Sequence, residues 1–131
     1  MDLIERIKEK VNEQTDLPVE MQIGYLDAVE SLVIYSLAGS TTTQEYMDGA
    51  KDVNVNYEVA MKSKDGALAE KALWRISETL DSLKEIASND NSYIFNKLRV
   101  TSKPFLNYFD EQGWFVFLLN FTVSITTNEG E

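Results

Sequence analysis

The sequence has no histidine and no cysteine among its 131 residues, and only two prolines. Without cysteine there is no disulfide framework and no thiolate metal site, which suits an intracellular or otherwise reducing environment. Without histidine, acid and base catalysis would fall to carboxylates, lysines or tyrosines with shifted pKa values. These absences favour a role in binding or assembly over a role in catalysis.

Basic charge is also scarce, because 12 basic residues face 22 acidic ones and the formal net charge is -10. Binding nucleic acid by phosphate neutralisation needs the opposite sign, so we expect no specific DNA or RNA binding. The first residues are charged and periodic, and no run approaches the ~20 apolar residues of a membrane span. We therefore predict a single domain over residues 1–131, without a signal peptide or membrane contact.

The first third of the chain predicts a helix followed by strands. Over residues 2–13, apolar side chains fall on one helical stripe, as expected for a short amphipathic helix. The helix is expected to end before Pro18, because the residue before a proline favours extended backbone. A brief strand is predicted over residues 21–25, and the β-branched and aromatic run at 31–37 predicts a buried strand.

Residues 41–50 are polar apart from Tyr46 and Met47, and their alternation is too short to define a strand. A connection of this length is often functional or mobile. Two interpretations remain open, an ordinary hairpin connection and a loop that becomes ordered on a partner.

The remaining sequence predicts strands on either side of a long helix. Strict alternation from Val53 to Lys62 predicts a strand with one wet face. Asp65 is a suitable N-cap for a helix that reaches about Ala87. Three more strands are predicted, over residues 93–101, 105–109 and 114–126, and Gly113 suits the turn before the last. In the first of these three strands, Ile94, Leu98 and Val100 are expected on one side, and Phe95, Lys97 and Arg99 on the other.

This order of elements predicts an α+β fold, in which a mostly antiparallel sheet carries the N-terminal helix and the long helix on a face. No spacing of residues matches a calcium loop, a phosphate-binding loop or a nucleophile elbow. Pairs of carboxylates occur on predicted helices and at Asp110-Glu111, where solvent exposure or the turn itself explains them. We therefore expect no cofactor, no metal and no enzyme activity.

Two features predict contacts with other molecules. Lys97, Arg99 and Lys103 cluster beside aromatic residues, a pattern that suits either single-stranded nucleic acid or salt bridges within the sheet or with a neighbouring subunit. In so acidic a chain, salt bridges are the better interpretation, and Lys97 and Arg99 become candidate interface residues.

The last strand is apolar on both faces over its first half. One face carries apolar residues from Phe115 to Ile125, and the other carries Trp114, Val116 and Leu118 before it turns polar at Asn120. The second apolar side is either buried within the monomer or covered by another subunit. Trp114 and Val116 are therefore also candidate subunit-interface residues.

The C-terminal hairpin resembles that of the tail terminator proteins of long-tailed phages, often labelled minor capsid proteins in phages of Gram-positive hosts. Pro104, Asp110-Glu111-x-Gly113-Trp114 and Asn120-Phe121-x-Val123 carry the resemblance over about the last 30 residues. It implies a non-enzymatic virion protein of the tail, assembled in the host cytoplasm as a ring, commonly a hexamer.

In that family the ring caps the tail tube, ends its polymerisation and provides the surface that joins the head. The resemblance implies that residues 41–50 meet the major tail tube protein, and it makes Thr42, Thr43, Tyr46 and Met47 candidate partner-binding residues. Head–tail connector proteins are the other expected partners, and DNA passes through the lumen without specific binding. An alternative function is a small acidic adaptor or inhibitor that mimics DNA and binds a basic protein groove.

Overall fold

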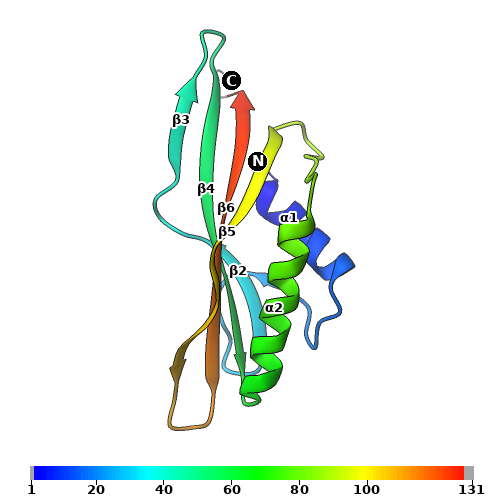
Figure 1. The fold of residues 1–131 in the computed structure, drawn as a ribbon, viewed down its shortest axis with the longest axis vertical. Helices are drawn as coiled ribbons and strands as arrows, with labels where there is room; N and C mark the ends of the chain where they lie inside the picture. Colours follow the sequence, from blue (N-terminus) through cyan, green and yellow to red (C-terminus); the bar gives the residue numbers. More distant parts are fainter. Residues whose placement is uncertain (1, 129–131) are drawn as a thin grey trace.

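A computed structural model describes residues 2–128 and contains a six-stranded sheet with two helices on one side (Figure 1). This arrangement confirms the predicted α+β fold. The elements in chain order are α1 (Leu3–Gln14), β1 (Gln22–Ile23), β2 (Ser31–Ser36), β3 (Thr41–Glu45), β4 (Ala50–Ser63), α2 (Gly66–Ser82), β5 (Tyr93–Phe109) and β6 (Phe115–Asn128).

The two long strands β4 and β6 form the spine of the sheet and pair along their whole length. The strand order is β1-β2-β4-β6-β5, and every pair is antiparallel except β1 with β2. Because β6 occupies one edge of β4, β2 and β3 share the other edge, at residues 57–62 and 51–54 respectively. Figure 1 shows that β3 and the start of β4 consequently extend beyond the helices.

The core lies between the helices and one face of the sheet. Helix α1 contributes Leu3, Ile7 and Val11, the stripe expected from its periodicity. Helix α2 begins at the predicted cap, since the Asp65 side chain accepts a hydrogen bond from the Leu68 N–H at 3.1 Å. From the sheet, the core receives the odd-numbered side chains of β4 and β6, which include Tyr57, Val59, Met61, Phe117, Leu119, Phe121, Val123 and Ile125.

Helix α2 ends at Ser82, five residues earlier than predicted. Leu83 has extended backbone, and the chain then places Ile86 in the core with no exposed surface. The Ile86 carbonyl accepts a hydrogen bond from the Tyr93 hydroxyl at 2.7 Å, and burial raises the pKa of Tyr93 to about 12. The apolar periodicity continues past Ser82 because these residues are buried, although they are not helical.

Residues 41–45 form strand β3 and pair with β4, which agrees with a hairpin connection, one of the two interpretations left open for residues 41–50. The structure corrects the predictions for residues 93–109. The predicted strands at 93–101 and 105–109 are one strand, β5, which is interrupted by bulges. The bulge between Phe95 and Lys97 changes the alternation, so Phe95 packs against the core while Ile94 is exposed.

Candidate assembly surfaces

The face of the sheet opposite the helices carries the even-numbered side chains of β4 and β6, and we name it the open face. Val33, Ala60 and Val116 are buried on it, yet they do not belong to the core cluster that contains the helices. Trp114 and Leu118 lie on the same face by alternation. Side chains of the sheet itself therefore provide the cover here, and no helix of residues 2–128 contributes to it.

One half of the open face is apolar. The Cα pairings place four apolar residues in one row across four strands, Val33, Ala60, Leu118 and Phe105. Tyr25 extends this surface, because its ring lies 6.3 Å from that of Tyr35 on β2 and it is 88% exposed. Tyr108 of β5, which pairs with Val116 of β6, is also exposed. We name Tyr25, Val33, Phe105, Tyr108 and Leu118 the open-face patch.

Tyr35 marks the border between the apolar and the polar half. Its hydroxyl donates to the Glu58 carboxylate on β4. Burial, and then this hydrogen bond, raise the pKa of Tyr35 well above its ordinary value. The phenol consequently stays neutral and remains a donor over the physiological pH range.

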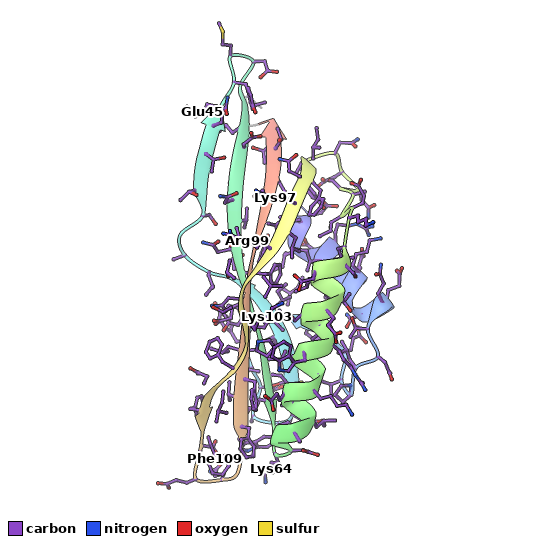
Figure 2. All side chains as sticks on the ribbon, in the orientation of Figure 1. Glu45, Lys64, Lys97, Arg99, Lys103 and Phe109 are labelled. Carbon is purple, nitrogen blue, oxygen red and sulfur yellow. The ribbon has the colours of Figure 1, made fainter. Side chains whose placement is uncertain are left out.

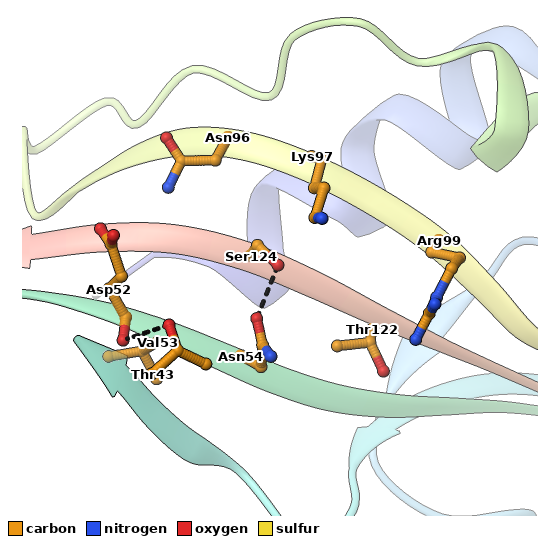
Figure 3. Close-up of a pocket in the computed structure, with 9 residues that line it drawn as sticks. All are labelled: Thr43, Asp52, Val53, Asn54, Asn96, Lys97, Arg99, Thr122 and Ser124. Carbon is orange, nitrogen blue, oxygen red and sulfur yellow. Dashed lines mark hydrogen bonds between the residues drawn. The ribbon is translucent and has the colours of Figure 1, made fainter.

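The other half of the open face is a polar ladder between β4 and β6, of which Figure 3 draws the rung between Ser124 and Asn54. Each rung is a side-chain hydrogen bond from a hydroxyl of β6 to an oxygen of β4. The rungs are Thr122 to Asn56 at 2.7 Å, Ser124 to Asn54 at 2.6 Å and Thr126 to Asp52 at 2.6 Å. The rungs satisfy polar groups on a face that would otherwise need water or a partner.

Lys97 and Arg99 lie beside this ladder and line a trough of about 420 Å³ (Figure 3). Their Cα partners are Ser124 and Thr122. Within residues 2–128, neither cation is within ion-pair distance of a carboxylate. Lys103, by contrast, forms a salt bridge of 2.8 Å with Asp81 of α2, so its partner lies on a helix of the same chain and not, as predicted, within the sheet.

The hairpin of β3 and β4 presents the four predicted partner-binding residues at the far end of the sheet. Thr42 and Thr43 are exposed on β3, and Tyr46 and Met47 lie in the turn, with Met47 fully exposed. The Tyr46 hydroxyl donates to Asp52 at 2.7 Å, which raises the pKa of Tyr46. Hydrogen bonds from Thr126 and Tyr46 in turn hold the pKa of Asp52 below its ordinary value.

Trp114 and Val116 lie at the opposite end of the open face. The Lys62 and Lys64 ammonium groups lie 5.0 and 5.2 Å from the Trp114 ring centroid, in cation–π geometry. Val116 is only 2% exposed. All four predicted interface residues are thus on one face, with Lys97 and Arg99 on its polar half and Trp114 and Val116 on its apolar half. Their role in an interface stays a prediction.

Sequence reasoning missed a second apolar surface, on the helix side of the β5–β6 hairpin. Leu106 and Phe109 are exposed there, and the rings of Phe109 and Phe115 lie 4.5 Å apart. Trp74 of α2 is also exposed and lies one helical turn before Ser77, which accepts from Lys103 of β5. We name Leu106, Phe109 and Trp74 the hairpin patch. The sequence feature that could have indicated this patch is the run Phe105-Leu106-Asn107-Tyr108-Phe109, in which apolar side chains occur at both odd and even positions.

A model of the family described as bacteriophage tail terminator protein matches residues 10–127 of the chain. The chain belongs to this family. The resemblance inferred from the hairpin is confirmed at the level of the family, and the chain is a structural component of the phage virion. A comparison with curated proteins found no match. Across residues 2–128, no helix is long and apolar enough to cross a membrane.

Proposed function

We propose that the protein forms a ring at the head-proximal end of the tail tube. Rings of this family are commonly hexamers, and we propose the same for this chain. The ring ends polymerisation of the major tail tube protein and provides the surface to which the head joins through connector proteins. It acts by binding and not by catalysis. The observation that carries this proposal is the open face, a sheet surface that no described helix covers in a member of the tail terminator family.

The β3–β4 hairpin is the part that we propose contacts the tail tube protein. Thr42, Thr43, Tyr46 and Met47 lie there, beyond the end of the helix layer (Figure 1). The bond from Tyr46 to Asp52 fixes one side of the turn, while Met47 extends into solvent. A flexible apolar side chain on a supported turn suits insertion into a partner's surface.

The open face carries charges of both signs, and this supports a ring over a DNA mimic. A mimic needs its carboxylates on one contiguous outer surface, whereas the open face presents Lys62, Lys97 and Arg99 together with Asp52 and Glu58. We propose that other, acidic parts of the ring line the lumen, where like charge keeps passing DNA from adhering. Assembly takes place in the host cytoplasm.

Removal of the protein from the phage tests the terminating function. An early stop codon in the gene is expected to give tails of uncontrolled length that fail to join heads, measured by electron microscopy of lysates. A plasmid copy of the wild-type gene is expected to restore tail length. Tails of normal length in the absence of the protein would contradict the proposal.

Substitution in the β3–β4 turn tests the partner surface. Met47→Asp places a charge at the proposed contact and is expected to abolish capping of purified tail tube protein, measured as tube length by electron microscopy. Val29→Asp is the matched control, because Val29 is also an exposed apolar residue but precedes β2, whose first residue pairs with Lys62 at the other end of β4. Equal capping by both variants would place the contact elsewhere.

A further inference from the structure

We propose that copies of this chain join head to tail, with the hairpin patch of one copy seated on the open-face patch of the next. The inference rests on the proposed ring and identifies the two surfaces that build it. Figure 2 shows Phe109 of the hairpin patch at the same end of the molecule as Lys64, which lies beside Trp114.

The two patches lie on opposite faces of one sheet. Leu106 and Phe109 pair with Phe117 and Phe115, whose side chains point to the helix side. Phe105 and Tyr108 pair instead with Leu118 and Val116 on the open face. A single strand therefore presents exposed apolar side chains in both directions, Leu106 and Phe109 on one face and Phe105 and Tyr108 on the other.

Because the two patches lie on opposite faces of the sheet, the way they are used decides the symmetry of the contact between copies. If copies met through the hairpin patch alone, the contact would be isologous and the open-face patch would remain exposed. If one patch binds the other, every copy uses both, and the contact is heterologous. Heterologous contacts close into rings when the rotation allows, which is the assembly that the proposed function requires.

The charges near the two patches allow complementary pairs. Lys62 and Lys64 flank Trp114 on the open face, and neither has a carboxylate partner among the described residues. On α2, Glu70 and Glu78 lie one turn to either side of Trp74, are exposed, and form no salt bridge within residues 2–128, although the exposed Lys71 also lies one turn from Trp74. A neighbouring copy would thus bring carboxylates of the hairpin-patch side to the two lysines.

The free edge of β5 favours contact through side chains over strand pairing between copies. Four bulges interrupt the strand, and Pro104 lacks a backbone donor. Lys97, Arg99 and Lys103 add charge along the same strand. Natural sheets use these devices to prevent edge-to-edge pairing. The apolar side chains of residues 105–109 are then the part of β5 that is free to bind a partner.

Site-directed cross-linking tests the contact directly, because the natural chain contains no cysteine. Phe109→Cys is mixed in turn with Tyr25→Cys, Leu118→Cys and Tyr108→Cys, and a short bis-maleimide is added. Covalent dimers are expected in at least one mixture and not with Phe109→Cys alone. Met47→Cys is the control partner and is expected to give none.

The double variant Tyr25→Cys/Phe109→Cys extends the test to the whole ring. The two positions lie near opposite edges of the sheet, about 19 Å apart at ~4.8 Å per strand, so a short linker cannot join them within one copy. A ladder of covalent oligomers that ends at the ring size supports the proposal. Dimers of Phe109→Cys alone would show an isologous contact and overturn it.

The tail assay separates this inference from the proposed function. Rings seen by electron microscopy without cross-links in any mixture would overturn the contact and leave the ring intact. Cross-links together with normal tail length in the gene-deletion phage would support the contact and remove the terminating role. Phe109→Asp is expected to abolish oligomers in light scattering, whereas Met47→Asp leaves them unchanged.

Discussion

The two faces of β6 follow the same alternation but differ in what covers them. On the core face, side chains from Phe117 to Ile125 pack continuously against the helices. On the open face, the strand changes from Val116 and Leu118 to a hydroxyl ladder, and no described helix covers either half. The core face is therefore completed by the helices, whereas the open face is covered only by side chains of the sheet itself.

The largest expected effect on stability separates two neighbouring positions of β6, one on each face. Phe121 is 1% exposed and its ring lies 5.5 Å from Tyr57, so Phe121→Ala should cost about 3–5 kcal/mol of unfolding free energy. Thr122 lies on the open face, and Thr122→Ala should cost about 1 kcal/mol through the lost bond to Asn56. Urea unfolding measures both. Equal losses would mean that the two faces are equally part of the core.

Trp114 sharpens the comparison because its own chain covers it only in part. Loss of the two cation–π contacts predicts a cost of about 1–2 kcal/mol for Trp114→Ala. The variant should also lose oligomers in light scattering at concentrations where urea unfolding finds it folded. Trp114→Phe, which keeps an aromatic ring, is the control. A variant that loses stability but assembles normally would mean that Trp114 has a purely structural role.

Sequence patterns predicted the core face well because burial against helices imposes a strict period. The alternation from Val53 to Met61 and the apolar stripe of α1 both correspond to core residues. The same rule failed at Ser82, because burial of Ile86 continues the pattern while the backbone leaves the helix. Periodicity reports which side chains are buried, and it reports the backbone only indirectly.

The assembly surfaces were harder to predict because they depend on which strands pair and in which register. The four bulges of β5 have no sequence signal comparable to a Gly turn, so the exposed position of Ile94 was missed. The hairpin patch combines Trp74 with Leu106 and Phe109, which are distant in sequence. Trp114, Val116, Lys97 and Arg99 were predicted one by one, and only the strand register places them on one face.

A smaller effect is expected within the polar ladder. Ser124→Ala removes the donor to Asn54 and leaves a half-buried amide unpaired, so it should cost about 1 kcal/mol. Asn54→Ala/Ser124→Ala removes both partners and should cost less than the sum of the single changes. Urea unfolding of the four proteins gives the coupling energy. Additive costs would contradict the bond and leave the ladder without a role in stability.

The smallest expected effect is a local response of the open face to acid, centred on Asp52. Hydrogen bonds from Thr126 and Tyr46 lower the pKa of Asp52 from its ordinary 3.8, so they stabilise the charged, folded form. This contribution is complete above about pH 4 and is lost as pH falls through the lowered pKa. Asp52→Asn should therefore flatten the pH dependence of amide exchange in β3 as the pH falls below about 4. The core-face amides of Phe121 and Val123 serve as the internal control, because their exchange should follow global unfolding in both proteins. An unchanged acid response of β3 in Asp52→Asn would mean that another carboxylate controls this end of the sheet.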